Sequence, residues 1–186
     1  MSGPRMKLGA EIERWLAPQE RFDALRAEAM RHGGSDFADL AYANPQDGPP
    51  PSVLRALREL LAVGSPVDLQ YTPHGGATVP RRLVARALTT SIGLPFRYSD
   101  VVLTPGAMGA LTLVMRWLAA TSGERRGEVI IPVPCWLDHP LYAEEAGLKP
   151  VLVPMNPETL RLDLGALERA LSDDTVAVVQ IGRAHV

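Results

Sequence analysis

Two short stretches of this sequence combine residue types that could bind a ligand. The first, where an apolar run changes to helical spacing, is Leu103-Thr104-Pro105-Gly106-Ala107-Met108-Gly109-Ala110-Leu111. Small residues at such a point let backbone N–H groups face a ligand, and the positive end of the helix dipole favours an anion. We therefore predict a phosphate site at Gly106, Ala107 and Met108. Close packing of the helix on a sheet is the alternative reason for the glycines.

The second stretch follows the next apolar run and reads Pro132-Val133-Pro134-Cys135-Trp136-Leu137-Asp138-His139. The face of Trp136 can stack on a flat aromatic ring, or the side chain can pack under the helix that follows. His139 lies near a helix start, where histidine also occurs as a surface or capping residue. Cys135 is expected to be a small buried side chain.

Strands and helices are predicted to alternate from Ser99 onward, and this alternation positions both stretches. The predicted strands are 101–104, 128–132, 151–154 and 176–180, and the predicted helices are 106–120, 138–146 and 164–171. Apolar strands in this order give an α/β fold with a mostly parallel sheet flanked by helices. Because each stretch follows a strand, both are expected at the carboxyl edge of the sheet, where ligands of such sheets bind.

The first hundred residues are predicted to be helices joined by loops. Apolar residues at helical spacing indicate three helices, at 10–32, 52–62 and 78–92. In the third helix, Leu83, Val84, Ala87 and Leu88 are expected to face a core. The loop over 67–77 contains Tyr71, and residues 37–41 are expected to be a short extended segment.

Taken together, the motifs resemble those of one enzyme family. They are Thr-Pro-Gly-x-x-Gly-Ala-Leu at 104–111, Pro-x-Trp-x-x-His at 134–139 and Ala-Gly-Leu at 146–148. This set is similar to the aspartate-aminotransferase branch of the fold-type I pyridoxal-phosphate enzymes. The resemblance implies the large domain of that fold, truncated and preceded by an N-terminal helical segment. It divides the chain into an arm with part of the small domain (1–50) and a partial cofactor-binding large domain (51–180).

The resemblance also implies a role for single residues in binding pyridoxal 5'-phosphate. Gly106, Ala107 and Met108 match the turn that holds the cofactor phosphate, although the family often has a hydroxyl residue where Met108 stands. Trp136 matches the aromatic side chain that stacks on the pyridine ring. His139 matches a histidine that supports the acid at the pyridinium nitrogen.

Two further assignments by resemblance fall in the first hundred residues. Tyr71 matches a tyrosine that reaches the phosphate of the neighbouring subunit's cofactor, and as a loop residue it could instead be only a packing residue. Ala43 and Asn44 lie where the family has a glycine-containing segment near the substrate carboxylate, and Ala43 departs from that glycine. No catalytic residue and no metal ligand is assigned in this chain.

By resemblance, the full-length protein would be a homodimer that moves an amino group from an amino acid to a 2-oxo acid. The chain itself is expected to be inactive, because neither Lys7 nor Lys149 fits the motif of the Schiff-base lysine. The family's Asn-Pro-x-Asn-Pro-Thr-Gly run, the aspartate for the ring nitrogen and the substrate-binding arginine are also missing.

Three alternatives stay open: a lyase or decarboxylase on the same fold, a nucleotide-binding module, and a non-catalytic ligand-binding domain. The nucleotide interpretation lacks both a Walker Gly-Lys-Ser/Thr run and a third glycine.

Composition is typical of a soluble globular protein without a strong charge. The 186 residues carry a net charge of −2, which gives no overall attraction to nucleic acid or anionic lipid. No apolar run approaches the roughly 20 residues that span a bilayer, and no signal peptide is evident. With one cysteine no internal disulfide can form, so a reducing cytoplasm is the expected setting.

Residues 181–186 match one reading frame of a sequencing-library adapter and are expected to be foreign.

Overall fold

The structure is a computed structural model that describes residues 9–34, 37–42, 45, 47–123 and 125–180. The chain divides into two units, one of Met1–Ala24 with Pro105–Val186 and the other of Leu25–Thr104. Helix α1 (Ala10–Gly33) contributes residues to both units. The predicted foreign tail, 181–186, lies outside the described residues. The predicted domain boundary at residue 50 stays a prediction.

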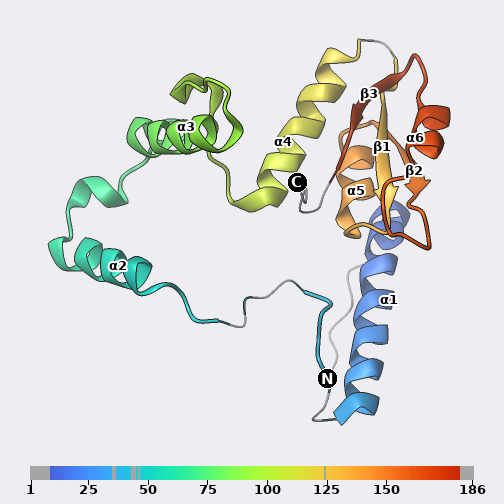
Figure 1. The fold of residues 1–186 in the computed structure, drawn as a ribbon, viewed down its shortest axis with the longest axis horizontal. Coiled ribbons are helices and arrows are strands. Elements are labelled where there is room, and N and C mark those ends of the chain that lie inside the picture. Colours follow the sequence, from blue (N-terminus) through green and yellow to red (C-terminus); the bar gives the residue numbers. More distant parts are fainter. Residues whose placement is uncertain (1–8, 35–36, 43–44, 46, 124, 181–186) are drawn as a thin grey trace. The chain divides into compact units, whose positions relative to one another are not determined.

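A three-stranded parallel sheet forms the centre of the first unit (Figure 1). Its strands are β1 (Glu128–Val133), β2 (Lys149–Pro154) and β3 (Thr175–Val178), in the order β2-β1-β3. β1 pairs with β2 from Glu128↔Lys149 to Val133↔Pro154, and its pairing with β3 has a register shift after Glu128. The predicted α/β fold with a mostly parallel sheet is confirmed, because the described strands pair in parallel.

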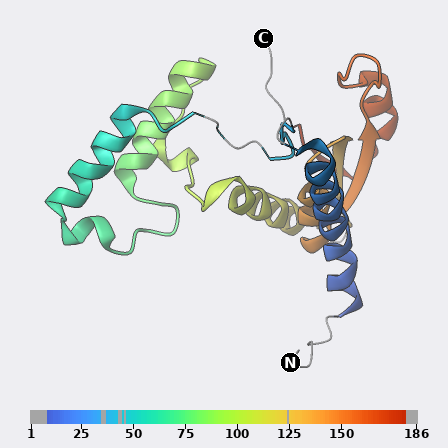
Figure 2. The same cartoon turned by 90° about the horizontal axis from the view of Figure 1, so that it is seen from below.

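Helices α4 (Gly106–Thr121) and α5 (Asp138–Glu145) cover one face of this sheet (Figures 1 and 2). Val129 and Ile131 point to that face because side chains two residues apart in a strand share a side. The buried core of the unit consists of Met115, Val129, Ile131, Tyr142, Ala143 and Leu148. Helix α6 (Leu164–Ala170) packs against β2. Burial of these apolar side chains is the main stabilising contribution to the unit.

The second unit is made of helices and turns. It contains α2 (Pro51–Val63), the 3-10 turn η2 (Pro66–Leu69), α3 (Thr78–Ile92) and the 3-10 turn η3 (Tyr98–Asp100). Apart from the short 3-10 turns and the segments treated next, the predicted helices and strands match the observed ones to within two residues at each end.

Residues 101–104 do not form the predicted strand. Val101 has extended backbone angles, but the N–H of Leu103 donates to the carbonyl of Gly75 at 3.0 Å, in the loop before α3. A strand needs a ladder of backbone hydrogen bonds with a neighbouring strand, and the three described strands leave these residues out. The short extended segment expected at 37–41 is likewise outside the sheet.

The expected orientation of α3 is wrong for three of its four inward residues. Leu83 and Val84 are 64% and 37% exposed and Ala87 is exposed, Leu88 is half-buried, and Ala85 is the buried residue of this helix. The helix packs against η3, and a turn of three residues covers little of its surface. The periodicity therefore predicted the helix correctly, but only Leu88 of the four residues expected inside is partly covered.

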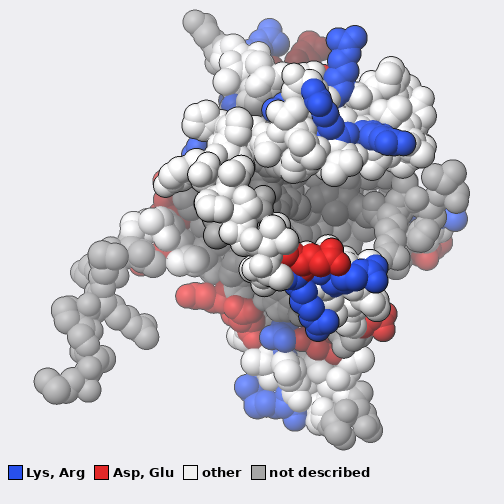
Figure 3. Space-filling view, turned by 90° about the vertical axis from the view of Figure 1, so that its left-hand side faces the viewer, with Lys and Arg blue, Asp and Glu red and all other residues white. Residues whose placement is uncertain are grey.

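The face drawn in Figure 3 has no single dominant charge. On the face in Figure 3, Lys and Arg side chains lie at several separate places, Asp and Glu side chains occur on the same face, and other residues cover most of it. No helix of the described part of the chain is long and apolar enough to cross a membrane.

Candidate functional site

Gly106 begins α4 in the left-handed region, with φ at +72°. A Cβ built on this residue would meet no other atom within 4 Å, so a ligand has room to approach the backbone. Pro105 occupies the N-cap position and provides no side-chain cap, and N–H groups in the first turn of a helix lack partners within the helix. The side chain of Met108 is 60% exposed. The turn therefore provides the backbone donors and the open approach that a phosphate needs.

Trp136 follows the carboxyl end of β1 and is half-buried. Its indole Nε1 donates to Asp138 Oδ2 at 2.8 Å. Its ring meets the edge of Phe22 of α1, with 6.1 Å between ring centroids and 75° between the planes. The chain reaches this residue through a cis peptide bond between Val133 and Pro134. Because two neighbours on different elements contact the indole, its plane is set by the protein.

Asp138 is a residue of this site that sequence reasoning missed. Its carboxylate accepts hydrogen bonds from three side chains: the indole of Trp136, the hydroxyl of Tyr142 at 3.3 Å, and the amide of Gln19 on α1. The position in the first turn of α5 suits a negative charge. Burial raises the pKa of Tyr142, and the charge of Asp138 raises it further. The spacing of four residues between Asp138 and Tyr142 was the one sequence signal for this cluster.

His139 is 6% exposed, and its Nδ1 is buried without a hydrogen-bond partner among the described residues. Burial lowers the pKa of the imidazole, and the nearby charge of Asp138 acts in the opposite direction. A buried polar atom without a partner costs about 1–3 kcal/mol. The atom therefore fits a partner from outside the described residues, such as the acid that the family resemblance implies.

The Gly106 turn and Trp136 lie toward the same end of the first unit. In Figure 1, α4 begins at the end of the unit where the arrow of β1 finishes, and Trp136 comes just after that arrow. Tyr71 belongs to the second unit, in the loop after η2, and its side chain is fully exposed. Its role stays a prediction, as do the roles of Ala43 and Asn44, which lie outside the described residues.

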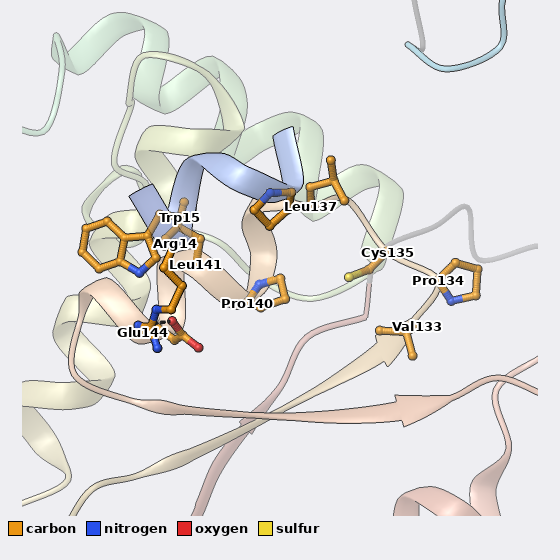
Figure 4. A pocket seen from close by; sticks show the side chains of 10 residues that line it. Arg14, Trp15, Val133, Pro134, Cys135, Leu137, Pro140, Leu141 and Glu144 are labelled. Carbon is orange, nitrogen blue, oxygen red and sulfur yellow. Dashed lines mark hydrogen bonds and ion pairs between the residues drawn. The ribbon is translucent and has the colours of Figure 1, made fainter. Parts of the chain in front are cut away.

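A pocket of about 510 Å³ lies between the start of α1 and α5, on residues that flank Trp136 in sequence (Figure 4). Its mostly apolar lining is Arg14, Trp15, Pro18, Val133, Pro134, Cys135, Leu137, Pro140, Leu141 and Glu144. Arg14 and Glu144 form an ion pair at 3.1 Å. Cys135 is half-buried, and this burial raises the pKa of its thiol. The residues predicted to contact the cofactor phosphate (Gly106, Ala107 and Met108) and its ring (Trp136) do not line this pocket, so the pocket is distinct from the predicted cofactor site.

Metal binding has no obvious place in the part of the chain that the structure describes. There, no group of three or more His, Cys, Asp or Glu side chains could hold a metal ion.

Sequence comparison places both motifs inside one known family. The model of the aminotransferase class I and II family matches residues 35–183. An aspartate aminotransferase of Geobacillus stearothermophilus is 26% identical over 155 residues, which are 83% of this chain and 38% of that protein. A probable aspartate/prephenate aminotransferase of Thermus aquaticus is 30% identical over 155 residues, which are 83% of this chain and 39% of that protein. The chain thus spans about two fifths of the length of these curated relatives.

Solved structures agree on the fold. An amino transferase from Eubacterium rectale superposes with a TM-score of 0.75 at 24% identity, over 93% of this chain and 44% of that chain. A single mutant of the Thermus thermophilus aspartate aminotransferase superposes with a TM-score of 0.68 at 26% identity, over 96% of this chain and 44% of that chain. With the family match covering the Gly106 turn, the Trp136 segment and the parallel sheet, the chain belongs to the class I and II aminotransferase family and has the fold-type I architecture that its motifs predicted.

Proposed function

We propose that this chain supplies the phosphate turn and the ring-stacking side chain of a pyridoxal-phosphate site. The protein that contains it would transfer an amino group from an amino acid to a 2-oxo acid, as a homodimer. Aminotransferases of class I and II depend on pyridoxal phosphate, which when bound supplies an electron sink for the substrate carbanion. The observation that carries the proposal is the open, left-handed start of α4 at Gly106, inside the region that matches the family.

Each of the proposed cofactor contacts has a positioning task. The backbone N–H groups at Ala107 and Met108 hold the phosphate, and Met108 adds no hydroxyl, so the backbone carries this contact. The indole of Trp136 presents a face to the pyridine ring, and its bond to Asp138 keeps that face in place. His139 offers its buried Nδ1 to the acid that keeps the ring nitrogen protonated.

We also propose that the 186-residue chain has no transaminase activity by itself. Lys149 is the first residue of β2, and its Nζ lies 2.6 Å from a carboxylate oxygen of Glu128, the first residue of β1. Trp136 follows the opposite end of β1. A strand of six residues puts its two ends roughly 17 Å apart. Lys149 therefore lies at the wrong edge of the sheet to form a Schiff base with a ring beside Trp136, and Lys7 lies outside the described residues.

The proposal is tested by cofactor retention in the protein made from the complete gene. Gly106→Val should lose pyridoxal phosphate, because a branched side chain would fill the approach to the backbone. Gly123→Val is the matched control, since Gly123 follows the other end of α4 with a φ of +67° and no atom within 4 Å of a built Cβ. Trp136→Ala should retain less cofactor than Trp136→Phe, because stacking contributes on the order of 1 kcal/mol beyond burial.

The measurement is the absorbance of bound cofactor after dialysis, compared across these variants at equal protein concentration. If Gly106→Val retains as much cofactor as Gly123→Val, the phosphate does not bind at the start of α4, and the proposal fails.

A further inference from the structure

Two side chains of α1 lead to Trp136, the residue on which the proposed cofactor ring would stack. Gln19 and Phe22 are three positions apart in α1, so they lie on the same face of the helix. Both belong to the part of α1 that forms one compact unit with the parallel sheet, and Trp136 belongs to the same unit. The contacts of Gln19 and Phe22 with the Trp136 segment are therefore contacts within the first unit.

Phe22 contacts the indole directly. The rings of Phe22 and Trp136 meet edge to face, with 6.1 Å between their centroids and 75° between their planes, and both side chains are half-buried. Aromatic pairs favour this arrangement because the positive edge of one ring is attracted to the negative face of the other. The contact therefore favours one tilt of the indole over others.

Gln19 acts on the indole through Asp138. Its side-chain amide donates to Oδ1 of this carboxylate, while Nε1 of Trp136 donates to Oδ2 at 2.8 Å. A carboxylate turns easily about its bond to Cβ, and a donor from another helix on Oδ1 limits that rotation. Gln19 thereby keeps Oδ2 directed at the indole N–H. The indole is thus held at two points, by Phe22 at its ring and by Asp138 at its nitrogen.

We propose that Gln19 and Phe22 are positioning residues for the cofactor ring. They hold the indole of Trp136 in the plane in which it stacks on the pyridine ring, and neither residue touches the cofactor in this role. The inference rests on the proposed pyridoxal-phosphate site. It adds two residues of α1 that lie outside the residues matched by the family model, 35–183.

The test uses the protein made from the complete gene, freed of cofactor, and two probes that share a phosphate group. Inorganic phosphate reports the phosphate contact alone. Pyridoxamine 5'-phosphate adds the ring, and it lacks the aldehyde that would react with a lysine. The ratio of the two dissociation constants, that of inorganic phosphate over that of pyridoxamine 5'-phosphate, therefore measures the ring contact.

Phe22→Ala should lower this ratio by roughly two- to tenfold, the range that one aromatic contact contributes. Its affinity for inorganic phosphate should stay at the parent value. A loss of stability alone would weaken the binding of both probes alike and leave the ratio unchanged. Phe22→Leu should lower the ratio less than Phe22→Ala does, because leucine keeps most of the apolar volume.

Arg14→Gln is the matched control. It breaks another contact between the same two helices, the ion pair of Arg14 with Glu144 at 3.1 Å. Glu144 is six residues beyond Asp138 in α5, which is about 9 Å along the helix axis. This variant should therefore keep the parent ratio, although it also loosens the packing of α1 on α5.

Gln19→Met keeps the length of the side chain and removes the donor to Asp138, so it decides the matter if Phe22→Ala does not fold. It should lower the ratio less than Phe22→Ala does, because the bond from Trp136 to Asp138 remains. The parent ratio in a folded Phe22→Ala or Gln19→Met variant overturns the positioning role of that residue, and a fall of the same size in Arg14→Gln overturns both roles. A parent protein that binds pyridoxamine 5'-phosphate no more tightly than inorganic phosphate overturns the proposed ring contact itself, and with it this inference.

Discussion

The carboxylate of Asp138 holds three side chains at the start of α5, and its replacement should loosen all of them. Trp136 and Tyr142 donate to one oxygen, at 2.8 Å and 3.3 Å, and Gln19 of α1 donates to the other. Asp138→Asn keeps the shape and one accepting oxygen but loses the charge. Asp138→Ala removes both oxygens, and with them the acceptor for the indole of the partly buried Trp136 and for the hydroxyl of the buried Tyr142.

The two variants should differ in size of effect. A hydrogen bond to a charged group contributes about 1.5–3 kcal/mol, and a neutral one about 0.5–1.5 kcal/mol. Asp138→Asn should therefore lower the free energy of unfolding by about 1–2 kcal/mol. Asp138→Ala should lower it by about 2–4 kcal/mol, because the indole of Trp136 and the hydroxyl of the buried Tyr142 both lose their acceptor. Both variants should also retain less pyridoxal phosphate, since the indole of Trp136 loses its fixed plane.

The assay is urea unfolding of the protein from the complete gene, with Glu145→Gln as the control. Glu145 lies on the same helix, and its only described ion pair is with Arg116 at 4.0 Å, with both side chains exposed. Such a pair contributes about 0–1 kcal/mol. If both Asp138 variants unfold like Glu145→Gln, the carboxylate does not organise this end of the sheet, and the account of how Trp136 is oriented is refuted.

Three further predictions concern a buried histidine, the core and a lysine. Acidification from about pH 7 to pH 5 should destabilise the parent protein more than the His139→Phe variant. Burial lowers the pKa of His139 in the folded state, so as the pH falls through the ordinary value of 6.5 the unfolded chain takes up the proton first. Thermal melts at the two pH values measure this, and equal losses of stability in parent and variant would contradict it. Met115 is 1% exposed, so Met115→Ala should lower the free energy of unfolding by about 2–5 kcal/mol, and Met115→Leu by less than about 1.5 kcal/mol. Urea titrations measure both values, and a larger loss for leucine than for alanine would count against the core described here. Borohydride reduction of the 186-residue chain with pyridoxal phosphate should label no single lysine stoichiometrically, and stoichiometric labelling of Lys149 with turnover would disprove the proposed inactivity.

Local patterns were enough to predict most elements and the turn at Gly106, whereas the phosphate site at that turn stays a prediction. The helix expected over 78–92 is found at Thr78–Ile92, because apolar spacing and the following Gly93 act over a few residues. The apolar runs around 128–132 and 151–154 predicted parallel strands for the same reason, and β1 and β2 confirm them. The start of α4 at Gly106 also depends only on its neighbours in sequence. Tyr71 and Ala43 were assigned by resemblance alone, and their roles stay predictions.

Contacts between distant residues were decided only by the tertiary structure. Residues 101–104 have the composition of a strand, yet they bond to Gly75 and Arg81, because a strand also requires a neighbour with which to pair. The importance of Asp138 depends on Gln19, which is 119 positions away in sequence and reaches it only after α1 packs beside α5. Periodicity and turn chemistry act over one or two turns of chain, so the sequence determined the elements and the Gly106 turn, whereas packing determined which side chains hold Trp136 and Leu103 in place.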